Sequence, residues 1–329
     1  MFQPTADIET LRQRADLISN LRRFFEDRGF FEVDTPTLSG DIVVDRYLEP
    51  ISVRRKSVTA LPSTPGLDDS GDLLWLQTSP EFAMKRLVAA GANAIYQLAH
   101  AYRSGESGRL HNPEFTMLEW YRTGDTPEAA MERLGELATT ILGRDAFHLL
   151  TYRQAFQEHA GVDPLVAEPA QLQHVARGHG IQLEGLGDEE DIDFWRNLLL
   201  THVVEPKLGL GNPAIIYDWP ASQSALARVR LEHPPVAERF ELYVDGIELA
   251  NGYHELCDPV ELRRRNKEIN QLREQDDHST LPTESRLLAA MESGLPPCCG
   301  VALGVDRLVM LALGKNSLRE VMAFPLDIA

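Results

Sequence analysis

The spacing of apolar residues predicts an amphipathic helix near the start of the chain, from Ile8 to Arg28. Apolar side chains recur there at steps of three and four residues. Gly29 follows, at a position where helices often end in a left-handed conformation. Residues Phe31 to Thr35 then alternate between apolar and polar side chains, and Pro36 comes next. This pattern predicts a helix followed by a short strand.

A first hairpin is predicted by two neighbouring runs. The apolar run from Asn93 to Ala101 and the alternating run from Phe115 to Tyr121 are typical of strands, and glycine, asparagine and proline residues punctuate the loop between them. The loop presents the polar side chains of Arg103, Arg109, His111 and Asn112. Arginine offers a planar charged fork for phosphate or carboxylate, and Phe115 offers a flat face for an aromatic base. A solvated polar hairpin is the alternative interpretation.

A second hairpin is predicted from Val236 to His254, with a tight turn at Asp245-Gly246. Three glutamates, Glu241, Glu248 and Glu255, are spaced by seven residues, which would also suit a helix. The Asp-Gly and Asn-Gly pairs interrupt the run and favour strands. Carboxylate oxygens are ligands that Mg²⁺ prefers beside nucleotide phosphates. The alternative is exposed surface charge.

The rest of the chain gives simpler signals. Further strands are predicted at 73–76 and 214–220, and further helices begin near Pro80 or span 126–142, 152–159 and 263–275. A glycine-containing strand from Gly300 is predicted to lead into an apolar helix, opened by Arg307 and ending at Gly314. Residues 54–72 are predicted to form a mobile loop, and residues 160–210 carry few signals. The acidic run from Gly187 to Asp193 is predicted to be a solvated surface feature.

The composition is typical of a globular protein and argues against several other classes. The 329 residues are 43% hydrophobic and 25% charged, as in ordinary globular proteins, and they suffice for one large domain or two average ones. No apolar run approaches the roughly 20 residues that span a bilayer, so a cytoplasmic protein is expected. The three cysteines form neither a disulfide framework nor a zinc spacing. The net charge of −18 argues against a broad nucleic-acid surface.

Three segments together resemble a known family. The run from Arg103 to Arg122 is similar to motif 2 of the class II aminoacyl-tRNA synthetases, in the form shared by the lysine, aspartate and asparagine enzymes. The runs from Gly300 to Arg307 and from Arg28 to Pro36 resemble motifs 3 and 1. The resemblance implies an α+β catalytic core with a mostly antiparallel sheet flanked by helices. It also implies one domain over residues 1–329, with an insertion at about 125–210, and a homodimer formed through motif 1.

The resemblance implies a role for individual residues. Arg103 and Arg307 are the expected catalytic residues, which neutralise the phosphates of ATP. The expected ATP-binding residues are Arg103, Ser104, Gly105, Glu106, His111, Asn112, Phe115, Glu248, Leu249, Gly304 and Arg307. The expected ligands of Mg²⁺ are Glu241 and Glu248. The expected amino-acid-binding residues are Ser79, Glu81, Tyr121, Asn251, Glu255 and Ala302. Motif 2 usually reads Arg-x-Glu, but Gly105 fills the glutamate position here, so either Glu106 substitutes for it or the adenine contact is weaker.

Within the family, the chain resembles paralogues of the lysine enzymes that transfer an activated residue to a lysine side chain of translation elongation factor P. Three features favour this branch. The segment before the first predicted helix has no room for an anticodon-binding OB domain, the net charge is acidic, and Ser79 and Ala302 differ from the lysine enzymes. The implied substrates are ATP and (R)-β-lysine or lysine. A minimal lysine-tRNA ligase or a non-catalytic paralogue is the alternative, whereas an asparagine-type amide synthetase would need neither Glu81 nor Glu255.

Overall fold

The structure, a computed structural model, describes residues 2–54, 73–182 and 190–329. The chain forms two compact units, one made of Met1–Gly124 and Leu256–Ala329 (unit 1) and the other of Asp125–Glu255 (unit 2). Unit 2 begins where the insertion was expected to begin, and a single domain over residues 1–329 stays a prediction. Among the described residues, no helix is both long and apolar enough to cross a membrane. The predicted loop at 54–72 lies outside the described residues, apart from its first residue.

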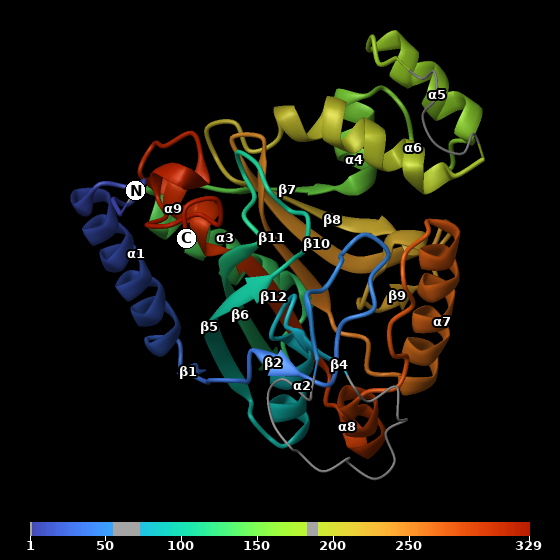
Figure 1. The fold of residues 1–329 in the computed structure, drawn as a ribbon. Helices are drawn as coiled ribbons and strands as arrows, with labels where there is room; N and C mark the ends of the chain where they lie inside the picture. The colour runs from blue at the N-terminus through green and yellow to red at the C-terminus, as the bar shows by residue number, and fades with distance from the viewer. Residues whose placement is uncertain (1, 55–72, 183–189) are drawn as a thin grey trace. The chain divides into compact units, whose positions relative to one another are not determined.

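Unit 1 combines strands with helices from both ends of the chain (Figure 1). Its elements are α1 (Ile8–Glu26), β1 (Phe31–Glu32), β2 (Leu38–Ser39), β3 (Ser52–Arg54), β4 (Leu73–Leu76), α2 (Glu81–Ala89), β5 (Ala94–Tyr102), β6 (Glu114–Thr123), α7 (Pro259–Gln275), α8 (Arg286–Gly294), β12 (Cys298–Gly304), α9 (Val305–Ala312) and the 3-10 helix η5 (Leu318–Glu320). Strands β1, β5, β6 and β12 lie side by side in that order, with β1 parallel to β5 and the other pairs antiparallel. Strands β2, β4 and β3 form a separate small antiparallel sheet.

The first helix and strand follow the predicted pattern. Asp7 caps α1 by accepting the N–H of Thr10, and Gly29 has a φ of +78° just after the helix. The strand is shorter than predicted: its register with β5 covers Phe31 and Glu32, and the Val33 N–H adds one bond to the Tyr96 carbonyl. Phe25 of α1 stacks on Tyr96 of β5, with ring centroids 5.0 Å apart. Burial of this aromatic pair attaches the helix to the sheet.

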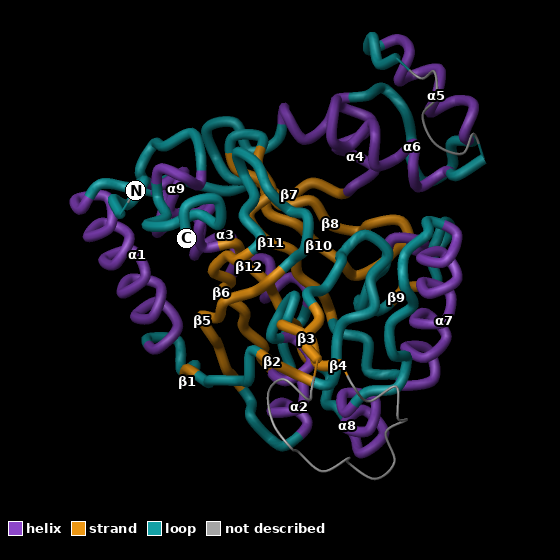
Figure 2. Tube along the Cα trace, viewed as in Figure 1, coloured by secondary structure: helices purple, strands orange, loops and turns teal. Residues whose placement is uncertain are grey.

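Unit 2 contains the other hairpin and a group of helices (Figures 1 and 2). Its elements are α3 (Pro127–Leu142), β7 (His148–Thr151), α4 (Tyr152–His159), α5 (Pro169–Gly178), α6 (Ile192–Leu199), the π-helix η2 (Leu200–Val204), the 3-10 helix η3 (Glu205–Lys207), β8 (Ala214–Pro220), the 3-10 helix η4 (Ala221–Gln223), β9 (Val229–Arg230), β10 (Val236–Val244) and β11 (Ile247–His254). Strands β11, β10, β8 and β7 follow one another, and β9 pairs with β10. Strands β7 and β8 are parallel, whereas β10 is antiparallel to β8, β9 and β11.

The helices of the insertion share a hydrophobic core with the strands of unit 2. Tyr152 of α4 packs on Trp219 of β8 with ring centroids 4.8 Å apart, and Trp195 and Leu199 of α6 are buried in the same cluster. The described end of the acidic run is exposed or partly exposed, as predicted for a surface feature. In addition, Asp191 caps α6, and Asp193 forms an ion pair with the buried Arg196. These carboxylates satisfy a helix end and a buried cation.

Candidate active site

Strand β6 carries the central row of candidate site residues in unit 1. In a strand, alternate residues face the same side, so Phe115, Glu119 and Tyr121 share one face. In the neighbouring strand β12, Ala302 lies directly opposite Glu119. Directly opposed residues of an antiparallel pair project to the same face. The register therefore brings the predicted residues Tyr121 and Ala302 to one place, beside a glutamate that was not predicted.

Glu119 lies at the centre of a buried polar cluster. Its side chain is fully buried, and it accepts hydrogen bonds from the Ser79 hydroxyl at Oε1 and from the Tyr121 hydroxyl at Oε2, the latter at 3.1 Å. Ser79 also accepts the backbone N–H of Glu81 at 3.1 Å, at the start of α2. The buried ammonium of Lys85, one helical turn further on, pairs with Glu81. Two segments of unit 1, residues 79–85 and strand β6, thus bring together two carboxylates and one ammonium.

Burial raises the pKa of Glu119 to about 8. The negative charge of Glu81 raises this pKa further, while the hydroxyls of Ser79 and Tyr121 and the ammonium of Lys85 lower it. A carboxyl group with this pKa changes its charge near neutral pH. The hydrogen bonds that Glu119 accepts from Ser79 and Tyr121 come from neutral hydroxyls, whereas the ammonium of Lys85 pairs with Glu81. A cationic ligand such as an amine would stabilise the ionised form of Glu119.

Arg103 and Phe115 lie together at the other end of the hairpin. The Arg103 guanidinium lies 5.0 Å from the centre of the Phe115 ring, and its Nη1 is 3.6 Å from Glu106 Oε1. Arg103 Nε is buried and has no hydrogen-bond partner among the described residues. A buried donor without an acceptor is costly, and a phosphate or carboxylate oxygen would satisfy it. Glu106, the residue that follows Gly105, lies within ion-pair distance of the motif 2 arginine.

Arg307 contacts the loop of the same hairpin. Its Nε donates to the backbone carbonyl of Leu110 at 3.2 Å, and its Nη2 lies 2.7 Å from His111 Nε2. An arginine always donates, so His111 Nε2 accepts in this arrangement. His111 of motif 2 and Arg307 of motif 3, both predicted to bind ATP, are thus in contact in the structure. Gly304 ends β12 just before helix α9, which carries Arg307.

The other predicted loop residues, Ser104, Gly105 and Asn112, differ in their burial. Asn112 is buried, and its amide donates to the carbonyl of Glu114 and accepts the N–H of Leu326, at 2.6 and 3.1 Å. It therefore fixes the loop and the C-terminal segment. Ser104 and Gly105 are exposed, and Gly105 has a φ of +80°, a left-handed conformation that glycine adopts without strain.

The hairpin β10–β11 carries the candidate metal ligands in unit 2. Glu241 lies opposite Asn251, and Tyr243 lies opposite Glu248. In a regular strand, residues 248 and 251 would face opposite sides because they are three positions apart. The pairing register shifts between Leu242 and Tyr243, as at a β-bulge, and this shift brings both residues to the face of Glu241.

Glu241 is held from both sides by protein donors. Its side chain is buried, Arg239 donates to Oε1 at 2.5 Å, and the Tyr243 hydroxyl donates to Oε2 at 2.6 Å. Burial raises the pKa of Glu241 to about 7, the charge of Arg239 lowers it, and the charge of Glu248 raises it. Repulsion between two carboxylates would be relieved by a divalent cation. Hard oxygen donors are what Mg²⁺ requires, and nucleotide phosphates usually complete its ligands, so the donor set fits. The described residues contain no cluster of three or more histidine, cysteine or acidic side chains suited to a metal.

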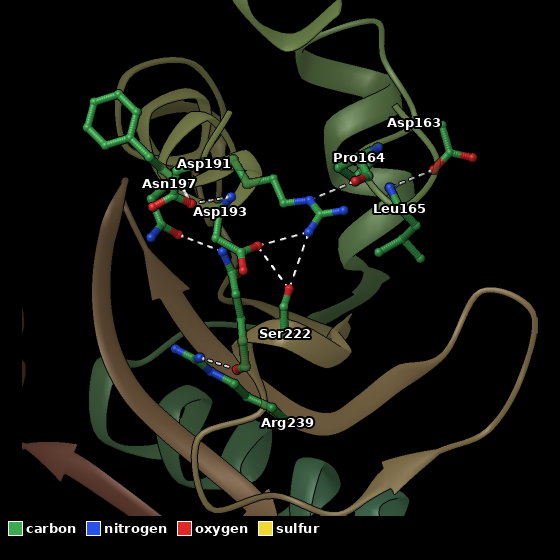
Figure 3. Close-up of polar contacts among 11 residues, drawn as sticks. Asp163, Pro164, Leu165, Asp191, Asp193, Asn197, Ser222 and Arg239 are labelled. Carbon is green, nitrogen blue, oxygen red and sulfur yellow. Dashed lines mark hydrogen bonds and ion pairs between the residues drawn. The ribbon is translucent and has the colours of Figure 1, made fainter. Parts of the chain in front are cut away.

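Arg239 is fixed in turn by the segment that follows β8. Its Nη1 donates to the carbonyl of Gln223 at 2.7 Å, and its guanidinium stacks 4.1 Å from the centre of the Trp219 ring. Figure 3 shows Ser222 of the same segment beside Asp193 of α6, to which its hydroxyl donates at 2.9 Å. Hydrogen bonds thus connect the helical insertion to the partner of Glu241 within unit 2.

The remaining predicted residues of unit 2 are buried or partly buried. Glu255 is 1% exposed and Leu249 is 3% exposed. Asn251 Oδ1 has no hydrogen-bond partner among the described residues. A buried amide oxygen of this kind is suited to accept a hydrogen bond from a ligand ammonium. The structure therefore gives two groups of predicted residues, one in each unit.

Glu119, Lys85 and Arg239 were not predicted as site residues from the sequence. A signal for Glu119 was available, because it lies between Leu118 and Trp120 in a strand whose two faces are both rich in apolar residues. A lone carboxylate in such a strand is expected to be buried and paired. Lys85 follows Glu81 by four residues on a predicted helix, which is the spacing of an ion pair. The importance of Arg239 depends on tertiary contacts that the sequence does not reveal.

Comparison with known proteins identifies the class. The family model for tRNA synthetases class II (D, K and N) matches residues 5–328, and the chain belongs to this family. The chain is also similar to proteins named elongation factor P–(R)-β-lysine ligase. It is 47% identical to the protein of Yersinia enterocolitica over 325 residues, which cover 98% of this chain and 97% of the relative. It is 47% identical to those of Yersinia pestis and Yersinia pseudotuberculosis over 329 residues, which cover 100% of this chain and 98% of each relative.

Proposed function

We propose that this protein is an ATP-dependent ligase that activates (R)-β-lysine, or lysine, and transfers it to a lysine side chain of elongation factor P. The names of its relatives, which match over nearly the full length, support this reaction. The observation that carries the proposal is the buried cluster of unit 1. Two buried carboxylates, Glu81 and Glu119, lie there, and the ammonium of Lys85 pairs with Glu81. Such a cluster favours a substrate that brings its own positive charge.

The reaction takes place in two steps. The carboxylate of the amino acid first attacks the α-phosphorus of ATP, and the bond to the β-phosphate breaks, which gives an aminoacyl-adenylate and diphosphate. The neutral amine of an acceptor lysine then attacks the acyl carbon. The bond to AMP breaks, and the acceptor nitrogen loses a proton, which leaves an amide. Both steps depend mainly on positioning and on neutralisation of phosphate charge.

Different residues of the chain are proposed to bind the phosphates, the adenine, the metal and the amino acid. Arg103, with its unsatisfied Nε, and Arg307 bind phosphate oxygens, and Phe115 stacks on adenine. Glu241 and Glu248 would hold Mg²⁺, which neutralises charge on the phosphates when it is bound. Glu81 receives the amino group of the amino acid, together with Ser79 and Glu119. Tyr121 and Glu255 are assigned to its distal ammonium, and Asn251 is a further substrate-binding residue.

A homodimer formed through motif 1 is part of the proposal. Ile8 of α1 and Phe31 of β1 are 59% and 54% exposed in the single chain, and a partner would cover such apolar side chains. Light scattering coupled to size-exclusion chromatography tests this point. A mass of twice 36.8 kDa is expected, and a monomer at all micromolar concentrations would contradict it.

The reaction is tested by amino-acid-dependent exchange of pyrophosphate into ATP, followed by transfer to an acceptor. Exchange is expected with (R)-β-lysine and more weakly with lysine, and labelled amino acid is expected on elongation factor P. Arg307→Ala is the negative control, because it lacks the proposed phosphate contact. A minimal lysine-tRNA ligase would instead charge tRNA, and a non-catalytic paralogue would show no exchange with any amino acid.

A further inference from the structure

A side chain continues the pairing between β6 and β12 after β12 ends. The two strands pair as far as Gly304 opposite Met117, and the chain then turns into helix α9. Beyond this point, the backbone N–H of Thr116 in β6 donates to Asp306 Oδ2 at 2.7 Å. The first turn of α9 is therefore tied to β6 through the carboxylate of Asp306.

Asp306 is also held by a cation from the N-terminal helix. It is 2% exposed, and its Oδ1 lies 2.6 Å from Nη1 of Arg14 in α1. Arg14 Nη2 donates to the Thr116 hydroxyl at 3.1 Å. A buried carboxylate is stable only with a compensating charge and hydrogen bonds, and Arg14 supplies the charge. Three segments distant in the sequence thus meet at one carboxylate within unit 1.

The hydrogen bond between Asp306 and Thr116 lies next to two proposed ATP-binding residues in the chain. Thr116 directly follows Phe115, the proposed adenine platform, and Asp306 directly precedes Arg307, the proposed phosphate clamp. The Asp306–Thr116 hydrogen bond therefore joins the two backbone positions next to the residues that contact opposite ends of ATP. A change in the position of α9 relative to β6 would therefore move Arg307 relative to Phe115.

We propose that Asp306 is a positioning residue that holds Phe115 and Arg307 in register for one ATP molecule, and that Arg14 fixes Asp306. This inference rests on the proposed function, because it assigns ATP to Phe115 and Arg307. The amino-acid cluster of Ser79 and Glu119 has its own hydrogen bonds and does not include Arg14 or Asp306. Loss of the Arg14 contact is therefore expected to affect ATP more than the amino acid.

The test compares Arg14→Met and Arg14→Lys with Arg12→Met as the matched control. Arg12 lies on the same helix, and its ion pair with Glu9 is exposed. The dissociation constant of ATP with Mg²⁺ is measured by calorimetry, and the Michaelis constant of the amino acid by pyrophosphate exchange. We expect Arg14→Met to weaken ATP binding about ten-fold, because hydrogen bonds to charged groups contribute at this scale. Arg14→Lys should recover part of the loss, and the Michaelis constant of the amino acid should stay within about two-fold, since its contacts are intact.

Asp306→Asn provides a second variant, in case Arg14→Met does not fold. It keeps an oxygen for the Thr116 N–H but loses the charge that pairs with Arg14. A smaller loss of ATP affinity is expected, again without a change for the amino acid. Unchanged ATP binding in Arg14→Met or Asp306→Asn would overturn the inference. An equal loss for ATP and amino acid would also overturn it, because it would indicate a general structural role.

Arg307→Ala separates this inference from the proposed function. If Arg307→Ala binds ATP normally, the proposed phosphate clamp is wrong. If Arg307→Ala weakens ATP binding while Asp306→Asn does not, only the positioning role is wrong. In the double variant, Asp306→Asn should cause little further loss, because residues that act through one another are not additive. Fully additive losses would contradict the inference.

Discussion

Two buried glutamates, one in each unit, are held by different kinds of donor. Glu119 in unit 1 accepts bonds from two neutral hydroxyls, while the nearby ammonium of Lys85 pairs with Glu81. Glu241 in unit 2 accepts a direct bond from the guanidinium of Arg239 and one from a hydroxyl. Burial raises the pKa in both cases, to about 8 for Glu119 and about 7 for Glu241.

The difference between these donors indicates different ligands. The hydrogen bonds to Glu119 come from neutral hydroxyls, so a cation that arrives with the substrate would stabilise its ionised form. Glu241 already has a fixed cation, and its orientation is set through Arg239 and Tyr243. A carboxylate with fixed orientation and a second carboxylate, Glu248, on the same face is suited to a metal that needs strict geometry. Variants of the two carboxylates and of Ser79 test this division of roles.

The largest effect is expected for Glu241→Gln. Loss of the proposed metal ligand should lower the rate of pyrophosphate exchange by about 100-fold or more, because electrostatic stabilisation of the transferred phosphate is lost. Glu238→Gln on the same strand is the control, since Glu238 pairs with His254 and Arg230. An active Glu241→Gln enzyme with an ordinary Mg²⁺ requirement would contradict the metal assignment.

Glu119→Gln is expected to act on the amino acid instead. Its Michaelis constant should rise about 10- to 100-fold, because a buried charge partner is removed from the ammonium. The affinity for ATP should change little. Glu114→Gln is the matched control on the same strand, where the glutamate is exposed. A comparable rise for ATP would indicate that Glu119 supports the fold and does not contact the amino acid.

The dependence on pH gives a finer test of Glu119. Below pH 8 the free carboxyl holds a proton, because its pKa is raised to about 8. Binding of an ammonium favours the ionised form, so the proton must leave, and the Michaelis constant should fall as the pH rises from 7 toward 8. The ionisation of the free amino acid is measured separately over the same range, so that the remaining slope belongs to the enzyme. The slope should disappear in Glu119→Gln, and an unchanged slope would assign the titration to another group.

The smallest effect is expected for Ser79→Ala. The Ser79 hydroxyl donates to Glu119 and accepts the N–H of Glu81, so its loss should shift the position of both carboxylates slightly. The preference for (R)-β-lysine over lysine should change by about 10-fold, the scale of small pocket changes. The ratio of kcat/KM for the two amino acids measures it. An unchanged ratio would remove Ser79 from the determinants of specificity.

Much of the fold could be predicted because its signals are local. Helix α4 spans the predicted residues, and so does strand β8. The turn at Asp245-Gly246 has positive φ at both residues, as the sequence predicts. Helices α5 and α6 were not predicted, because their stability depends on burial of residues such as Trp195 against α4 and β8.

The site was predictable only in part. The motifs led to Arg103, Arg307 and the glutamates of the second hairpin. The shift of pairing register beside Tyr243 brings Glu248 and Asn251 to one face, and strict alternation along the strand would have separated them. The hydrogen bond from the Thr116 N–H to the Asp306 carboxylate joins segments 190 residues apart, and no spacing in the sequence indicates it.

A cross-titration of two variants tests the division of roles most directly. Pyrophosphate exchange is measured for Glu119→Gln and Glu241→Gln while the amino acid and Mg²⁺ are varied separately. We predict that Glu119→Gln raises the half-saturating concentration of the amino acid alone, and that Glu241→Gln alters the Mg²⁺ requirement alone. If each variant shifted both ligands to the same extent, the two carboxylates would not have separate roles, and the assignment of Glu119 to the amine and Glu241 to the metal would be wrong.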